Sequence, residues 1–200
     1  MIHMENEEDI MNRGQSIAIQ PDFNLEKAIE ATGYLLQLYG IQKPINFMKI
    51  LKLLYLADRK ALEDWERPIT YDTYVSMKHG QVLSNTYDFM KRQTQSEAWD
   101  KYFEIKFYYW ISLKEPIKLN YLSPAEIELL DQIYNKYGDY NMYDLAQMTH
   151  DLPEYVDPGD SSIITPMDNL LRSLSYDEDE IRRIIDELHS EASVDLLLGV

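Results

Sequence analysis

"KPINFMKILKLLYLADRKALEDW", residues 43–65, is the stretch that decides the fold. Its apolar residues recur at intervals of three and four, which is the spacing of one face of an α-helix. The members of this stripe are Phe47, Ile50, Leu51, Leu54, Ala57, Ala61 and Trp65. Leu53 and Leu56 extend the apolar surface beyond the stripe. Because a helix that is apolar on more than one side must be covered on each of them, the pattern predicts the central helix of the domain.

The remaining side of this helix is basic. It carries Lys49, Lys52, Arg59 and Lys60. We interpret it as a solvated face on which the Lys and Arg stems lie along apolar neighbours. The alternative is a stripe that binds phosphate groups.

Helix-start signals place further helices on both sides of the central one. The expected N-caps are Asn24, Ser84, Ser123, Asn141 and Ser175, and Thr165, Pro166 and Asp168 open a short helix. Ser123 with Glu126, and Ser175 with Glu178, have the spacing of a capping box. Together with the central helix, these signals predict about seven helices.

One segment has the period of a β-strand. Apolar and polar or larger aromatic residues alternate from Phe103 to Ile111, and Pro116 follows before a possible second short strand at residues 117–122. The predicted fold is therefore mainly α (α+β), a single compact helical domain of about seven helices with a small β hairpin. We expect residues 1–21 to be a flexible N-terminal segment and residues 22–200 to form the domain, with residues 152–166 as a loop.

The chain is strongly acidic. Its 200 residues carry a formal net charge of −16, and residues 151–200 alone hold 13 acidic residues and 3 arginines. Binding to DNA or RNA is disfavoured, since it depends on clustered cations that displace counterions from phosphates. A basic protein partner fits the charge better, although acidity that serves only solubility is the simpler alternative.

The sequence gives no sign of membrane insertion or secretion. No apolar run approaches the roughly 20 residues of a membrane span, and residues 1–14 are acidic, without the apolar region of a signal peptide. The chain has no cysteine, which excludes disulfides and thiolate chemistry and fits a reducing compartment. We expect a cytoplasmic protein.

Residues with the spacing of a catalytic, cofactor or metal site are absent from the sequence. His3, His79, His150 and His189 form no pair at ligand spacing, and there is neither a G-x-S-x-G motif nor a Gly-rich phosphate loop. We therefore expect no metal, no cofactor and no enzymatic activity. A hydrolase that uses His79 or His150 is the remaining catalytic hypothesis.

"KHG", residues 78–80, precedes the helix expected after Ser84. Gly80 supplies a position where φ can be positive, so a tight turn explains the triplet without catalysis. A structural or interface role is accordingly the favoured interpretation of His79.

Several segments together carry a family resemblance. Residues 52–57 read K-L-L-Y-L-A, Pro68 and Ile69 follow, and residues 78–82 read K-H-G-Q-V. Further on come Leu122-Ser123 with Glu126, then Tyr137-Gly138, and then Leu145 with Thr149-His150. From about residue 24 to 150 the chain resembles the Panacea domain family, which includes SocA-like antitoxins and phage GepA-like proteins. Gln81 stands where that family usually has Pro, which should either loosen the turn or let Gln81 form hydrogen bonds.

The resemblance implies an antitoxin that neutralises a cognate toxin by direct binding. Family toxins include small alarmone-synthetase-like enzymes, and one branch also delivers its toxin to a protease. A DNA-binding transcriptional autorepressor of its own operon is the alternative, supported only by the basic side of the central helix.

We expect an acidic surface that bears aromatic side chains to cover the toxin. Tyr and Trp make large, rigid contacts and dominate many protein interfaces. The candidate contact residues are Tyr74, Lys78, His79, Gly80, Gln81, Tyr108 and Trp110.

Overall fold

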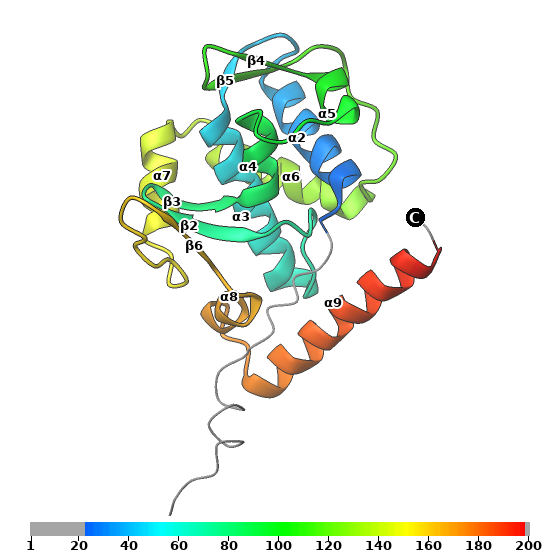
Figure 1. The fold of residues 1–200 in the computed structure, drawn as a ribbon, viewed down its shortest axis with the longest axis vertical. Helices are drawn as coiled ribbons and strands as arrows, with labels where there is room; N and C mark the ends of the chain where they lie inside the picture. The colour runs from blue at the N-terminus through cyan, green and yellow to red at the C-terminus, as the bar shows by residue number, and fades with distance from the viewer. Residues whose placement is uncertain (1–22, 199–200) are drawn as a thin grey trace, which may run out of the picture.

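Helices dominate the computed structural model, which describes residues 23–198, with side chains placed up to residue 190 (Figure 1). The predicted flexible N-terminal segment, residues 1–21, lies outside the described residues. The helices are α2 (Leu25–Tyr39), α3 (Phe47–Trp65), α4 (Ser84–Met90), α5 (Glu97–Tyr102), α6 (Pro124–Tyr137), α7 (Met142–His150), α8 (Met167–Ser173) and α9 (Glu178–Leu198). The strands are β1 (Ile45–Asn46), β2 (Tyr74–Met77), β3 (Gly80–Leu83), β4 (Phe103–Lys106), β5 (Trp110–Leu113) and β6 (Ser162–Ile164). The mainly α class with small antiparallel sheets is confirmed, and α5 is the helix that the sequence did not predict.

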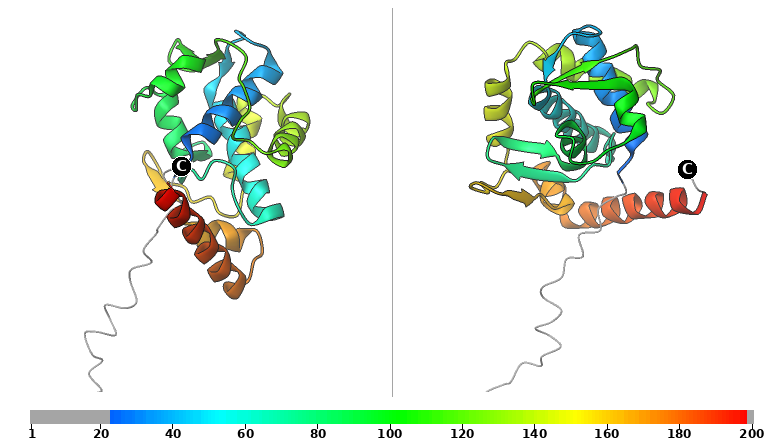
Figure 2. Two further views of the ribbon diagram at one scale, coloured as in Figure 1. Left: turned by 90° about the vertical axis from the view of Figure 1, so that its right-hand side faces the viewer. Right: turned by 45° about the horizontal axis from the view of Figure 1, so that its top comes forward.

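Helix α3 is central, as its two-sided apolar pattern predicts. Twelve of its nineteen residues are buried, and it packs against α2, α6, α7 and β3. Buried apolar side chains from α2 through α9 join it in one core cluster. Figure 2 shows α3 enclosed by the other elements, whereas α9 runs along the outside of the molecule. Helix α9 contributes Ile181, Ile184 and Leu188 to the core.

Two three-stranded antiparallel sheets flank the helices. Their strand orders are β1-β5-β4 and β3-β2-β6. In the first, Ile111 of β5 pairs with Ile45 and with Ile105. In the second, Val75 of β2 pairs with Val82 and with Ile164. Strand β6 thus belongs to a segment that the sequence predicts as loop.

Three predicted N-caps are confirmed, and in each the capping side chain accepts from an N–H group two or three residues further along the chain. Asn24, Ser123 and Asn141 each accept a backbone hydrogen bond at the start of their helix, and Ser123 forms the predicted capping box with Glu126. Gly40 follows α2 with a positive φ of 116°.

Two predicted caps were wrong. Ser84 is the first residue of α4, and the carboxylate of Asp72 accepts from the backbone N–H groups of Asn85 and Thr86 instead, at 2.8 and 2.9 Å. At α9, Asp177 and not Ser175 accepts from the first-turn N–H groups, at 2.9 Å from the backbone nitrogen of Glu180. In both places the cap is an aspartate carboxylate, which is a stronger acceptor than a serine hydroxyl.

The strand predicted from Phe103 to Ile111 is in fact a hairpin. Strand β4 ends at Lys106, a turn follows, and β5 begins at Trp110. Phe107 and Tyr108 have φ values of 47° and 64°, which reverse the chain. The second strand is therefore Trp110–Leu113 and not residues 117–122.

Candidate interaction surface

The basic side of α3 is mostly turned inward. Lys52 is 1% exposed, and its Nζ donates to the backbone oxygen of Gln81 at 2.8 Å. Burial lowers the pKa of Lys52 to about 7. Arg59 pairs with Glu154. Lys49, half-buried with its ammonium 4.8 Å from the centre of the Tyr39 ring, and Lys60, bound to Glu63 and Asp64, fit the predicted solvated face. Neither the solvated interpretation nor the phosphate-binding alternative holds for Lys52 and Arg59.

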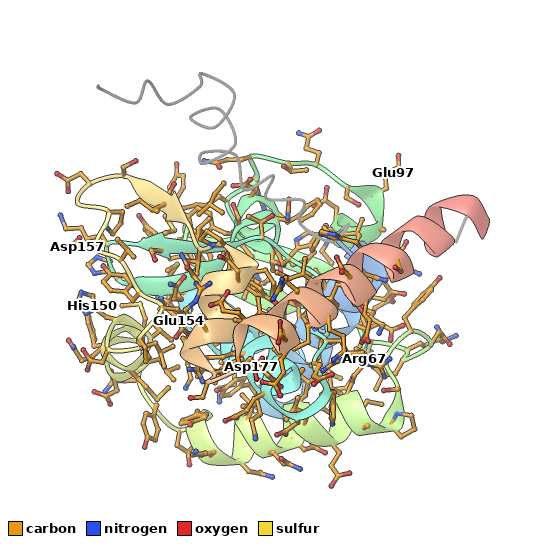
Figure 3. The ribbon with its side chains drawn as sticks, turned by 90° about the horizontal axis from the view of Figure 1, so that it is seen from below. Arg67, Glu97, His150, Glu154, Asp157 and Asp177 are labelled. Atoms are coloured by element: carbon orange, nitrogen blue, oxygen red, sulfur yellow. The ribbon has the colours of Figure 1, made fainter. Side chains whose placement is uncertain are left out.

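Glu154, in the segment after α7, completes this inward-facing arrangement. Its carboxylate accepts from the Tyr55 hydroxyl at 2.6 Å and from Arg59 Nε at 2.8 Å, and its side chain is 0% exposed. Burial alone would raise the pKa of Glu154, but the hydrogen bonds from Arg59 and Tyr55 outweigh it and lower the pKa. Figure 3 shows Glu154 on the side of the molecule that also carries His150 and Asp157.

Gln81 connects the β2–β3 hairpin to the segment that contains Glu154. Its Nε2 donates to Ser76 Oγ at 2.9 Å and to the backbone oxygen of Glu154 at 3.2 Å, and its Oε1 accepts from Thr165 at 3.1 Å. Of the two outcomes expected for a glutamine in place of proline, hydrogen bonding is the one observed. We call Lys52, Tyr55, Arg59, Gln81 and Glu154 the polar hub. Because all five are engaged with one another, the polar hub holds elements together and offers no open site.

Tyr74 also lies in the core, not on the surface. It is 2% exposed, and its hydroxyl donates to Asp58 Oδ2 at 3.3 Å. Asp58 is itself 0% exposed and accepts from the backbone N–H groups of Ile69 and Thr70. Burial raises the pKa of Asp58 to about 7, against the opposing effect of the Thr70 hydrogen bonds. The ring of Tyr74 is therefore unavailable as the surface contact that the sequence suggested.

The "KHG" triplet forms the turn that was predicted. Gly80 is buried with φ at 90°, and a Cβ there would lie 2.3 Å from Thr149 Oγ1 on α7. Lys78 and His79 are exposed at the tip, where Lys78 pairs with Asp160 at 2.7 Å.

The seven predicted contact residues consequently do not form one site. Tyr74, Gly80 and Gln81 are buried, whereas Lys78 and His79 lie on the β2–β3 turn. Tyr108 and Trp110 lie on the β4–β5 hairpin of the other sheet, drawn at the top of Figure 1.

The β4–β5 turn exposes four consecutive aromatic side chains, which we call the aromatic turn, Phe107–Trp110. Their exposed fractions are 84% for Phe107, 86% for Tyr108, 51% for Tyr109 and 42% for Trp110. Single exposed apolar residues are ordinary, but contiguous apolar patches on a soluble protein mark interaction sites. Tyr108 and Trp110 are among the contact residues predicted from the sequence, whereas Phe107 and Tyr109 are not, although all four form the run "FYYW".

The aromatic turn is strained and firmly held. Left-handed φ values at Phe107 and Tyr108 cost on the order of 1–2 kcal/mol per residue, because both have a Cβ. The backbone oxygen of Tyr109 accepts from the N–H of Phe47 at 2.9 Å, at the first turn of α3. The ammonium of Lys91 lies 4.8 Å from the centre of the Tyr109 ring. Strain of this kind, maintained by surrounding contacts, is frequent at functional sites.

Charge and aromatic exposure are separated along the chain. Residues 84–120, which include the aromatic turn, hold six basic and five acidic residues, whereas residues 151–190 hold eleven acidic residues and three arginines. The segment around the aromatic turn is therefore close to neutral, and the excess of acidic residues lies further along the chain.

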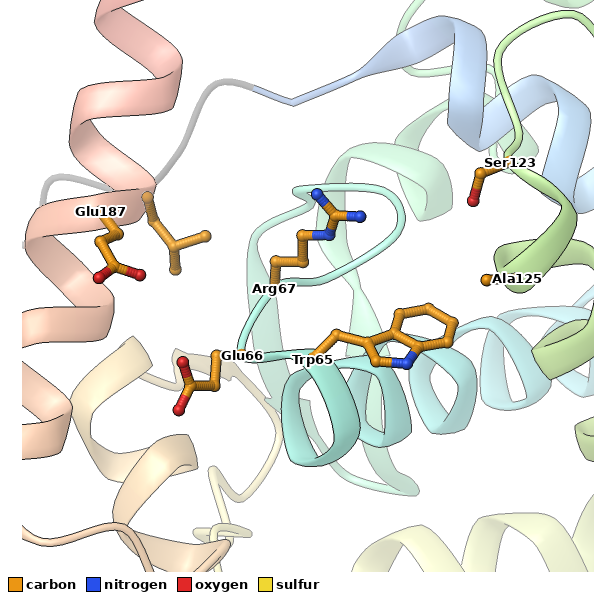
Figure 4. Close-up of a pocket in the computed structure, with 7 residues that line it drawn as sticks. Trp65, Glu66, Arg67, Ser123, Ala125 and Glu187 are labelled. Atoms are coloured by element: carbon orange, nitrogen blue, oxygen red, sulfur yellow. The ribbon is translucent and has the colours of Figure 1, made fainter.

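A cavity of about 390 Å³ lies between the end of α3, the start of α6 and α9. Figure 4 shows the Arg67 side chain extending between Glu187 of α9 and Ser123, the residue that caps α6. Glu66 and Glu187 in its lining are both bound by Arg183, and Ser123 is engaged in its capping box. Among the described residues, no group of three or more His, Asp or Glu side chains could hold a metal ion. None of the helices in the described part has both the length and the apolarity that crossing a bilayer demands.

Comparison with known protein families finds a match over half of the chain. The family described as antitoxin SocA-like, Panacea domain, matches residues 50–155. This range begins in α3 and ends just after Glu154, so it contains both hairpins and all members of the polar hub. No curated protein and no solved structure matches the chain.

Proposed function

Because the chain belongs to the family of SocA-like antitoxins with a Panacea domain, we propose that it neutralises a cognate toxin by direct protein–protein contact. The family match over residues 50–155 carries this proposal. The geometry of the matched segment supports it, since a buried polar hub holds a compact scaffold from which the aromatic turn projects.

The proposal includes the mode of action. The protein acts by covering the toxin, without bond chemistry of its own, in the cytoplasm where the toxin is made. A small alarmone-synthetase-like enzyme is the proposed class of toxin, and transfer of the bound toxin to a protease is a proposed second step.

The DNA-binding alternative loses its support. It depended on the basic side of α3, of which Lys52 is buried and Arg59 is paired with Glu154. A net charge of −16 also repels a polyanion.

Co-expression tests the proposal. The product of the adjacent gene should arrest growth alone, and co-expression of this protein should restore growth and yield a co-purified complex. Absence of both rescue and complex would contradict antitoxin function. A gel-shift titration on the upstream promoter at stated salt should show no specific shift with this protein alone. Depletion of individual proteases during co-expression should reveal a delivery step as accumulation of toxin.

A further inference from the structure

The aromatic turn carries the most exposed large apolar side chains of the described residues. Phe107 and Tyr108 are each more than four-fifths exposed, so they contribute little to the core. The fold nevertheless keeps both in left-handed conformations that favour glycine. Exposed aromatic side chains that the core does not need, on a backbone kept in a costly conformation, point to a partner.

We propose that the aromatic turn is the surface that enters the toxin, and that it occupies an apolar pocket with an acidic rim. This inference rests on the proposed function and specifies its contact surface. Exposed aromatic side chains that become fully buried in a pocket supply much of the affinity of many interfaces.

The turn is rigid before binding. The two strands below it pair in register, with Lys106 opposite Trp110, and β1 pairs on the other side of β5. The Phe47 N–H to Tyr109 oxygen bond ties the tip to α3, and Arg92 donates to the backbone oxygen of Ile105 at 2.9 Å. A pre-organised contact surface loses less conformational freedom on binding, which favours affinity.

The cations beside the aromatic turn indicate that the rim of the partner's pocket is acidic. Lys91 contacts the Tyr87, Phe47 and Tyr109 rings and forms no ion pair with a carboxylate of the described residues. Among the described residues, Lys106 at the end of β4 forms an ion pair with Glu104 alone, at 2.8 Å and with both side chains exposed. These two cations fit carboxylates around the partner's pocket, whereas the net charge of −16 disfavours an anionic membrane or a nucleic acid.

The test replaces the aromatic rings without damaging the fold. Glycine suits both left-handed positions, so Phe107→Gly/Tyr108→Gly should leave the melting temperature unchanged or raise it. The same variant should weaken toxin binding by about 100-fold or more and should fail to rescue growth. Tyr121→Ser, which removes a 57% exposed tyrosine from the loop before α6, should retain full binding.

A second pair of variants tests the rim. Lys106→Glu should slow association about 5- to 10-fold at low salt, and the difference should shrink at high salt. Lys78→Glu is the matched control, because Lys78 is an exposed lysine on the other hairpin that also pairs with one carboxylate. It should leave the association rate unchanged.

Each alternative occupant gives a distinct result. If the wild type fails to neutralise the toxin, the proposed function fails and this inference fails with it. If the wild type neutralises but the double glycine variant binds equally well, only the inference is overturned. It is also overturned if the variant binds the toxin normally while losing self-association or adsorption to anionic vesicles shown by the wild type. An effect of Lys78→Glu equal to that of Lys106→Glu overturns the assignment to the β4–β5 turn alone.

Discussion

Lys52 Nζ donates to the backbone oxygen of Gln81 at 2.8 Å, so the central helix α3 is joined to β3, the second strand of the β2–β3 hairpin. Neither Lys52 nor Gln81 has significant contact with solvent, and Gln81 continues the connection to Glu154 and Thr165. The polar hub thereby links α3, β3 and the segment after α7 through polar side chains, in addition to the apolar packing of α3 and β3 in the core.

Lys52 makes stability depend on pH. Below pH 7 its ammonium is protonated in both the folded and unfolded states, so the cost of burying the charge is fully present. As the pH rises from about 7 toward the ordinary value of 10.5, the folded state releases its proton first, and the free energy of unfolding increases. Lys52→Met keeps the apolar stem and removes the charge. Its stability relative to the wild type, measured by urea unfolding, should therefore be greater at pH 6 than at pH 9. An equal difference at both pH values would contradict a titrating Lys52.

Loss of the Glu154 carboxylate should destabilise the fold. Glu154→Gln leaves Arg59 without its counter-ion in a largely buried setting and should lower the free energy of unfolding by about 2–4 kcal/mol. Glu63→Gln is the control, because Glu63 pairs with Lys60 at 3.0 Å on the surface and is 48% exposed. That change should cost less than about 0.5 kcal/mol. Equal effects in chemical denaturation would show that Glu154 is not a central contact.

Alanine substitutions at Gly80 and Gly159 distinguish the cost of a steric clash from the cost of a positive φ. Both have positive φ, but a Cβ at Gly80 would clash with Thr149 and His150, whereas a Cβ at Gly159 meets nothing within 4 Å. Gly80→Ala should cost about 2–4 kcal/mol and Gly159→Ala about 1 kcal/mol, measured by thermal and urea unfolding. Similar losses would mean that α7 moves away from the hairpin easily.

The histidines test the catalytic hypothesis. His79 is exposed on the β2–β3 turn, and His150, at the end of α7, packs against Tyr155 with ring centres 4.2 Å apart and an angle of 37° between the ring planes. His79→Ala and His150→Ala should both neutralise the toxin as the wild type does in co-expression. Loss of neutralisation with intact toxin binding and an unchanged melting temperature would support a hydrolase instead.

Local signals predicted much of the helical scaffold. The α3 stripe and the caps at Asn24, Ser123 and Asn141 depend on residues within one or two helical turns, so the sequence contains the whole cause. Ser84 was mistaken for a cap because its competitor, Asp72, is brought to α4 by the tertiary fold. Strand β6 was missed for the same reason, since its partner β2 is far away in the sequence.

The candidate surface was predicted only in part. The alternation of residue types from Phe103 to Ile111 predicts a single strand. Aromatic residues rarely adopt a left-handed φ, so the residue types do not indicate the turn at Phe107 and Tyr108. Tyr74 was placed on the surface since a tyrosine suits either environment. The carboxylate of Asp58, 16 positions away, decides in favour of the core.

The pairing of β6 with β2 has a consequence for the nascent chain. The hydroxyl groups of Ser76 and Thr165 lie within hydrogen-bond distance although the two residues are 89 positions apart in the sequence. During synthesis, both hairpins and α7 are therefore made before β6 can pair with β2. During that interval one edge of β2 has open backbone groups, which can pair with other chains. We expect translation products that end between residues 156 and 161 to aggregate or to be degraded, even though they contain all of residues 50–155, which match the family.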